Sequence, residues 1–324
     1  MMSSYFDNEI RHLFAAVKDL DSEYYYFSLI KRSTVEISLA LNKCHEFCIC
    51  IPDSIECMPL LLGRLSVSAK KLESCNHASP VVLRGFFLSL QTDSVREAAA
   101  LVSLVYSYLM NPDSSSFTDW LKRVAELFRI DKVVNSIGLA GELLFLHRSC
   151  SLCPDIIRCW NPVGYSPFDF SPPPGLKISA YRSYFEVKSS NLDSHRYLLK
   201  TSQLLHQLSI SSSFTYVFSG IAVSANGVTL PEFCYQIYNS FAQQTSFDVE
   251  LKQLLYSKIE LLTAWLSMFA SDFRFDPLES SMSLVIEKNI PLPEQLHPAI
   301  SVEKYYLNST MVYSEPLEYF FNSN

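Results

Sequence analysis

An acidic and a basic side chain stand two residues apart in a segment that alternates as a β-strand does. Glu186 and Lys188 belong to the run 184–190, Tyr-Phe-Glu-Val-Lys-Ser-Ser. Side chains at i and i+2 of a strand share one face, so this pair can meet a common ligand while Phe185 and Val187 pack on the other face. The alternative is an exposed ion pair, worth roughly 0.2–1 kcal/mol. Spacing alone leaves both interpretations open.

Two further carboxylates precede this pair. Glu142 stands among leucines in the run 139–146, where a helix would bury it unless it faced a polar cleft. A position at the helix edge is the alternative. Asp169 lies between Phe168 and Phe170 and alternates as a strand residue should, although an Asp ahead of Ser-Pro-Pro-Pro can also begin a turn.

Three carboxylates and one amine on a sheet edge suggest a specific chemistry. Hard oxygen ligands suit Mg²⁺, and Mn²⁺ can substitute for it. An ion held in this way lowers the pKa of a bound water and stabilises a leaving oxygen, while a lysine orients or helps to deprotonate that water. The reaction that suits such a site is phosphodiester hydrolysis.

Hydrophobic periodicity predicts the elements that must position these side chains. The four strands expected between residues 35 and 90 predict a small antiparallel sheet, and the order strand, strand, helix, strand from 156 to 223 is that of an α/β unit. Residues 111–116 are expected to be a linker. We expect helices over 4–20, 93–110, 120–145 with a break, 200–208, 232–243 and 247–269, and strands over 35–39, 47–51, 65–68, 81–90, 156–160, 184–190, 214–223, 283–286 and 302–307.

Composition limits the classes of function. With 48% hydrophobic and 18% charged residues the chain is expected to fold throughout. No run of about 18 uncharged apolar residues is present and residues 1–20 are too polar for a signal peptide, so we expect no membrane span and a cytoplasmic protein. The net charge of −7 argues against tight, non-specific nucleic-acid binding by the whole surface.

A local basic segment departs from this acidic background. Residues 177–206 carry a net charge of +3. Arg196 and Lys200 in this segment are candidates for the edge of a site or for contacts with a DNA backbone. Ordinary surface charge is the alternative.

A second group of residues has the ligand types of a zinc site, and its members are His147, Cys150, Cys153 and Cys159. A second half-site at standard spacing is missing, so free thiols at a helix end and in a loop are the competing interpretation. The chain has no Gly-rich phosphate loop, which excludes nucleotide hydrolysis of the P-loop kind.

Several short motifs follow one another in a suggestive order. They are Gly141 to Leu146, Trp160 with Pro162 and Gly164, Asp169-Phe170, Phe185 to Ser190, and Thr201 to Leu204. In this order the chain resembles the PD-(D/E)XK motif proteins of bacterial restriction and phage-defence gene clusters. The strand, Pro-rich turn and closing strand over 283–306 are similar to the C-terminal part of that family, so the resemblance covers nearly the whole chain.

The resemblance implies an α/β fold with a restriction-endonuclease-like core, a mixed sheet flanked by helices that binds metal across two adjacent strands, joined to an N-terminal α+β domain. The implied roles are metal-binding acids for Asp169 and Glu186, a catalytic lysine for Lys188, further metal ligands for Glu142 and the backbone carbonyl of Val187, and a contact with the site or the DNA backbone for Gln203. Asp155, which follows Pro154, is an alternative first acid that lies ahead of Trp160.

The expected function is that of a Mg²⁺-dependent deoxyribonuclease with type II-like restriction chemistry acting on double-stranded DNA. The alternative is a DNA-binding or assembly subunit that keeps the nuclease fold and does not cut, and a structural protein without a site is a third possibility. Double-strand cutting would favour a homodimer. The resemblance implies a cytosine methyltransferase, a helicase-like ATPase and a MutL-like ATPase as partners. The expected domains are 1–114, the nuclease core 115–225, and a C-terminal extension 226–324 packed on that core.

Overall fold

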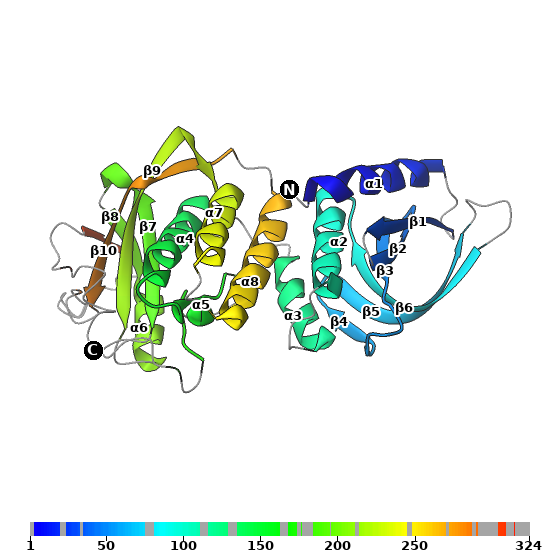
Figure 1. Ribbon diagram of the computed structural model, residues 1–324, viewed down its shortest axis with the longest axis horizontal. Coiled ribbons are helices and arrows are strands. Elements are labelled where there is room, and N and C mark those ends of the chain that lie inside the picture. The colour runs from blue at the N-terminus through cyan, green and yellow to red at the C-terminus, as the bar shows by residue number, and fades with distance from the viewer. Residues whose placement is uncertain are drawn as a thin grey trace. The chain divides into compact units, whose positions relative to one another are not determined.

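The chain forms two compact units, residues 1–133 with 260–270 (unit 1) and residues 134–259 with 271–324 (unit 2). The computed structural model describes residues 3–19, 24–32, 35–74, 81–110, 116–128, 135–162, 168–173, 176, 184–194, 196–210, 214–244, 248–269, 272–286, 290, 304–308 and 314 (Figure 1). The expected domain boundary at residue 114 therefore differs from the division of the units, and residues 226–259 and 271–324 belong to the same unit as 134–225.

Unit 1 is a curved sheet with helices packed beside it. The strand order is β1-β2-β3-β6-β5-β4, with antiparallel neighbours, and β1 also pairs with β5 through Tyr25 and Ser74. The small antiparallel sheet predicted for this region is confirmed, although β1 and β4 were not expected. Its elements are α1 Ser3–Ala16, η1 Val17–Asp19, β1 Tyr25–Arg32, β2 Val35–Asn42, β3 Glu46–Cys50, β4 Leu60–Leu62, β5 Leu65–Ser74, β6 Val81–Gln91, α2 Val95–Met110 and α3 Phe117–Leu127.

Aromatic packing explains why α3 belongs to unit 1. Tyr108 near the end of α2 lies with its ring centroid 5.4 Å from that of Phe117 and 4.8 Å from that of Trp120, both on α3. Phe117 and Trp120 are buried. The expected linker over 111–116 falls between these helices, and residues 111–115 lie outside the described part of the chain.

Unit 2 is built around a mixed sheet of order β10-β9-β7. Strand β7 runs parallel to β9, from Phe185 opposite Thr215 to Asn191 opposite Ile221, and β10 is antiparallel to β9. The predicted α/β class is confirmed at this level. The elements are α4 Ser136–Cys150, α5 Ile156–Cys159, β7 Phe185–Asn191, η2 Leu192–Ser194, β8 Arg196–Lys200, α6 Thr201–Ile210, β9 Thr215–Thr229, α7 Leu230–Ala242, α8 Val249–Ser267, β10 Arg274–Ile286 and β11 Lys304–Asn308. The part of α8 from Glu260 onward belongs to unit 1.

Helix α4 packs on β7 and β9 and has α7 beside it (Figure 1). Two isolated bridges extend the sheet on the other side of β7, because Phe170 pairs with Phe185 and Trp160 pairs with Phe170, both antiparallel. The backbone groups of Phe170 and Phe185 exchange two hydrogen bonds of 3.1 Å. These bridges place the segment around Asp169 next to the beginning of β7.

The strand expected over 156–160 is wrong, because Ile156–Cys159 forms the short helix α5. Backbone bonds from Ile156 N to the Cys153 oxygen and from Trp160 N to the Ile156 oxygen, both 3.1 Å, close this turn. A run of a few apolar residues does not distinguish a strand from a buried helical turn by periodicity.

Two other expectations need correction or fall outside the described residues. The helix expected over 120–145 with a break is divided into α3 and α4. Strand β8 was not expected, and its last residue, Lys200, was expected to begin a helix. The Pro-rich turn and residues 302–303 of the closing strand lie outside the described part of the chain. Among the described helices, none has the length and apolar character needed to span a membrane.

Candidate functional site

Strand β7 brings Glu186 and Lys188 together as the spacing predicts. The Lys188 ammonium lies 2.6 Å from Oε1 of Glu186, and the two side chains are only 17% and 5% exposed. Phe185 and Val187, which flank Glu186, are buried as well. The pair is therefore an inner ion pair, and the interpretation as an exposed surface pair is wrong.

Gln203 completes this contact from helix α6. Its side-chain oxygen accepts a 2.9 Å hydrogen bond from Lys188, and its side-chain nitrogen donates a 2.6 Å hydrogen bond to Oε1 of Glu186. One amide thus fixes both members of the ion pair. Helix α6 begins at Thr201, directly after β8. The glutamine of the motif over 201–204 therefore contacts both Glu186 and Lys188.

Asp169 joins the same strand through the backbone. Its Oδ2 accepts a 2.7 Å hydrogen bond from the backbone N–H of Val187. The antiparallel bridge between Phe170 and Phe185 explains this position, because it sets residue 169 beside residues 186 and 187. Asp155 is different, since its carboxylate pairs with Arg158 at 3.1 Å, and Arg158 also pairs with Glu250 at 2.9 Å.

Glu142 approaches from helix α4. Helix α4 lies very close to the sheet at the preceding residue, Gly141. A Cβ added to Gly141 would lie 1.9 Å from Ser189 Oγ and 3.1 Å from Ser219 Cβ. Burial raises the pKa of Glu142 well above its ordinary value, and the charges of Asp169 and Glu186 raise it further. Glu142 is therefore near Asp169 and Glu186.

The three carboxyl groups share one electrostatic environment. Burial raises the pKa of Asp169 to about 8, and the Glu186 charge adds to this rise, whereas the Val187 N–H and Lys188 oppose it. Burial also raises the pKa of Glu186, against the opposing effects of Lys188 and Gln203. Burial and like charge both favour the protonated, neutral form of a carboxyl group, so a further cation would be needed to hold all three groups ionised.

The three carboxyl groups are ligands of the kind that a hard divalent cation prefers, but their positions do not form a coordination site. Carboxylate oxygens at high charge density are ligands for Mg²⁺ or Mn²⁺. In the part of the chain that the structure describes, no three His, Cys, Asp or Glu side chains are arranged to hold a metal ion. Oε1 of Glu186 instead accepts hydrogen bonds from Lys188 and Gln203.

Two side chains close to the site were not anticipated. Gln207, one turn after Gln203, is fully buried, accepts a 2.8 Å hydrogen bond from the Tyr216 hydroxyl and, by hydrogen bonding, lowers the pKa of Glu186. The buried indole N–H of Trp160 lies close enough to Glu142 to lower its pKa, although it does not meet the geometry of a hydrogen bond with any described group. The spacing of four residues between the glutamines was a signal for Gln207, because such residues share a helix face.

The expected cationic edge lies on β8. The side chains of Arg196 and Lys200 are both exposed, and Lys200 directly precedes helix α6. A contact of either side chain with the site or with DNA stays a prediction. The Val187 carbonyl also stays a predicted ligand, since the described contact of this residue with Asp169 is through its N–H.

The proposed zinc ligands pack against, or form hydrogen bonds with, other groups of the protein. His147 packs edge-on against Phe233 with ring centroids 5.4 Å apart, and burial lowers its pKa. Cys150 is buried, which raises its pKa well above the ordinary value, and the Cys159 thiol donates a 3.6 Å hydrogen bond to the Asp155 carbonyl. The described residues provide no metal-holding group that contains these side chains.

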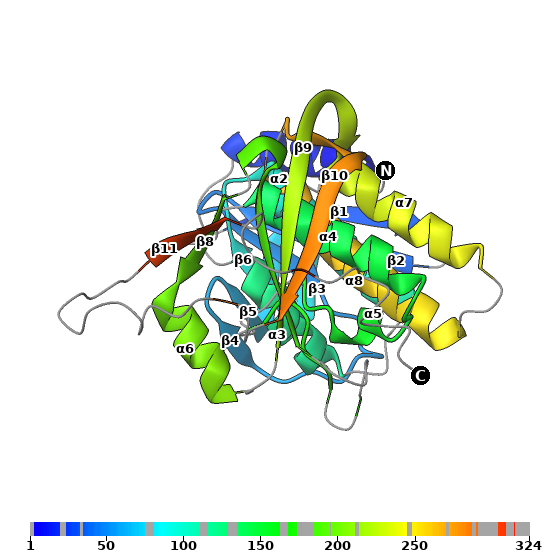
Figure 2. The same cartoon turned by 90° about the vertical axis from the view of Figure 1, so that its left-hand side faces the viewer.

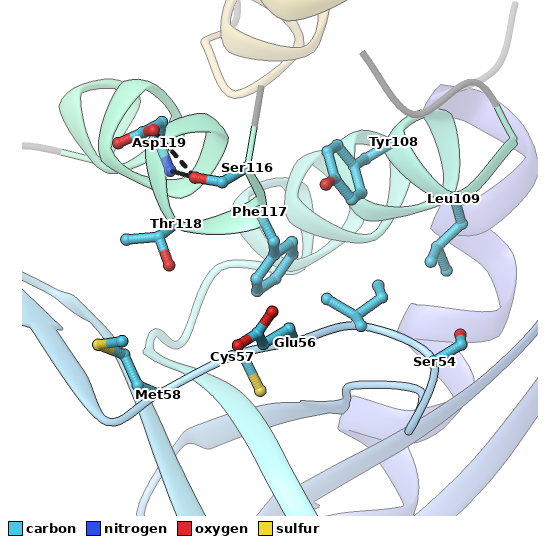
Figure 3. Close-up of a pocket in the computed structure, with 11 residues that line it drawn as sticks. Ser54, Glu56, Cys57, Met58, Tyr108, Leu109, Ser116, Phe117, Thr118 and Asp119 are labelled. Carbon is cyan, nitrogen blue, oxygen red and sulfur yellow. Dashed lines mark hydrogen bonds between the residues drawn. The ribbon is translucent and has the colours of Figure 1, made fainter. Parts of the chain in front are cut away.

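Unit 1 has a pocket of its own, with a volume of about 710 Å³. Phe117 on α3 and Glu56, in the segment before β4, point toward each other in it (Figure 3). Its lining combines aromatic, apolar and acidic side chains. The lining residues are Ser54, Ile55, Glu56, Cys57, Met58, Tyr108, Leu109, Ser116, Phe117, Thr118 and Asp119.

Comparison with known proteins yields no relative from which a function could be transferred. No family model, no curated protein and no solved structure matches this chain. The likeness to PD-(D/E)XK proteins therefore stays a prediction based on the order of the motifs.

Proposed function

We propose that this chain is a metal-dependent DNA endonuclease with a restriction-endonuclease-like core, acting in a bacterial restriction or phage-defence system. One observation carries the proposal: Asp169, Glu186 and Lys188, which come from two separate segments, lie together, and Gln203 from a third segment is bonded to the last two. Glu142 adds a third carboxyl group within reach of their charges. Titratable groups whose pKa values are perturbed by burial and by specific charge partners cluster at functional sites.

Asp169, Glu186 and Glu142 would hold the metal, Mg²⁺ or Mn²⁺. The raised pKa values of all three carboxyl groups support this, because a bound cation would relieve the cost of their burial. When bound, the ion supplies an acidic water and stabilises charge on a leaving oxygen.

Lys188 would position the reacting groups. An ammonium has three N–H donors, and among the described residues two of them serve Glu186 and Gln203. The third can reach a water or a phosphate oxygen. Glu186 and Gln203 both bond to the ammonium, and Gln203 also bonds to Glu186, so the ammonium stays in one place as a substrate arrives.

A second candidate is a subunit that keeps this site and cuts only in complex, or never. It is favoured by the state of Glu186, whose Oε1 already accepts bonds from Lys188 and Gln203. Freeing this oxygen for a metal requires an exchange of partners that DNA or a further subunit could drive. The cytosine methyltransferase, the helicase-like ATPase and the MutL-like ATPase are the proposed partners, and a homodimer would supply the second cut.

The deciding experiment is cleavage of unmethylated supercoiled plasmid with Mg²⁺ or Mn²⁺, using the wild type and Lys188→Met. Lys70→Met is a matched control, because Lys70 forms a similarly inner pair with Glu46 in unit 1, with side chains 22% and 27% exposed. Metal-dependent nicking by the wild type and the control, lost in Lys188→Met, supports the nuclease. DNA binding without cutting under any condition, including with the proposed partners, would favour the non-cleaving subunit. Equal cutting by all three proteins would contradict the assignment of the site.

A further inference from the structure

Strands β8 and β11 form a separate two-stranded ribbon in unit 2. They pair antiparallel over their full lengths, from Arg196 opposite Asn308 to Lys200 opposite Lys304. We call residues 196–200 and 304–308 the β8/β11 ribbon. Figure 2 shows the two strands side by side, with β8 continuing directly into α6.

One face of the ribbon is fixed to the core. Tyr197, Leu199 and Leu307 are buried, and they belong to a cluster that includes Phe218 of β9. The rings of Tyr197 and Phe218 lie 4.6 Å apart. Because strand side chains alternate, this anchoring turns the residues between them outward.

The outward face combines cations with apolar groups. Arg196 and Lys200 are exposed, Leu198 is 39% exposed and Tyr306 is 61% exposed. The Arg196 guanidinium lies 4.8 Å from the centre of the Tyr306 ring. The ten residues of the ribbon contain no Asp or Glu, in a chain whose net charge is −7. The face is therefore a local cationic surface with an aromatic side chain on it.

The ribbon leads directly to the candidate site. Lys200 precedes Thr201, the first residue of α6, and Gln203 follows within the first turn. Lys200 and Gln203 are three residues apart, so their Cα atoms lie within about 11 Å of each other, whatever the local conformation. Gln203 contacts both Glu186 and Lys188. A polyanion held by the ribbon would thus run toward the Lys188 ammonium.

We propose that the β8/β11 ribbon binds the backbone of double-stranded DNA beside the phosphodiester that Lys188 meets. The role of Lys188 in this statement rests on the proposed function, whereas the binding surface does not. A two-stranded ribbon has the width of the major groove, and its cations can neutralise phosphates on the groove rim. Tyr306 holds the Arg196 guanidinium in place, which reduces the entropy that this side chain loses on binding.

The test is equilibrium binding of the full chain to a fluorescent DNA duplex, measured in EDTA at several salt concentrations. Arg196→Ala/Lys200→Ala is compared with Lys31→Ala/Lys122→Ala, a control that removes the same charge from side chains of unit 1 that are 73% and 56% exposed. The ribbon variant should bind roughly tenfold more weakly, and its slope of log K against log salt should be smaller by about 2. The control and the wild type should behave alike.

Equal affinities and equal salt slopes for the two double variants would overturn the proposal, as would a folded wild type that binds no duplex. If the ribbon variant lost affinity only for poly-glutamate or only for single-stranded DNA, the ligand of the ribbon would be that polyanion and not duplex DNA. Cleavage is measured separately in Mg²⁺. Duplex binding that depends on the ribbon, without any cleavage, would leave the ribbon assigned and the nuclease rejected. Cleavage by the wild type, together with unchanged duplex binding in the ribbon variant, would support the nuclease and reject the ribbon as the DNA-binding surface.

Discussion

The Lys188 ammonium and Oε1 of Glu186 are 2.6 Å apart in an ion pair whose side chains are 17% and 5% exposed. Removing one partner from such a pair leaves a desolvated group without compensation. We expect Lys188→Met to lower the free energy of unfolding by about 3–5 kcal/mol, and Glu186→Gln/Lys188→Met to be more stable than the sum of the single changes predicts. Urea unfolding of the four proteins gives the coupling energy.

The control for this cycle is Lys31 with Glu36, whose side chains are 73% and 51% exposed and 3.7 Å apart. Its coupling should be near zero, because solvent screens an exposed pair. A coupling for Lys188 and Glu186 as small as that of the control would contradict the inner ion pair.

A divalent cation should stabilise the protein through the three carboxyl groups. Burial raises the pKa of Glu142, Asp169 and Glu186, so a cation that binds only the folded state relieves this cost. We expect Mg²⁺, Mn²⁺ or Ca²⁺ to raise the melting temperature, EDTA to reverse the rise, and Asp169→Asn to remove most of it. Asp155→Asn, which changes a carboxylate paired with Arg158, should keep the full rise. A rise of equal size in both variants would exclude Asp169 as a ligand.

The sequence predicted most of this site, because its signals were local. Alternation placed Glu186 and Lys188 on one strand face, and the order of the motifs selected Asp169, Glu142 and Gln203. Burial of the pair was not predictable, since it depends on α6 and on the segment around Phe170, which come from elsewhere in the chain. The short helix at Ile156 and strand β8 were missed, because runs of four or five residues carry too little periodicity.

Gly141 should tolerate no side chain. An added Cβ would lie 1.9 Å from Ser189 Oγ and 3.1 Å from Ser219 Cβ, where α4 meets β7 and β9. We expect Gly141→Ala to destabilise unit 2 by about 1–3 kcal/mol, since a packed interface must open to admit the methyl group. Gly141→Ala/Ser189→Ala should recover part of this loss, because the nearest atom is gone, and Ser189→Ala alone serves as the control. Thermal unfolding that is unchanged in Gly141→Ala would mean that α4 does not approach the sheet so closely.

Acid should weaken unit 1 through the Glu97 carboxylate. Burial alone would raise the pKa of Glu97, but hydrogen bonds from Arg64, at 2.9 and 2.6 Å, and from the Thr92 hydroxyl, at 2.5 Å, lower it overall. A carboxyl group whose pKa is lower in the folded state than in the unfolded state stabilises the fold above its unfolded pKa of about 4.3, and this contribution is lost as the pH falls through the folded value.

Glu97→Gln should therefore be less stable than the wild type by about 1–3 kcal/mol at pH 6–8, because it loses charge-assisted hydrogen bonds, and the difference should shrink below about pH 4. Urea unfolding from pH 3 to pH 8 measures it. Glu36→Gln, which changes a half-exposed carboxylate 3.7 Å from Lys31, should show a small difference at every pH. A gap between the wild type and Glu97→Gln that widens in acid would reverse the sign of the linkage and reject the Arg64–Glu97 pair as its origin.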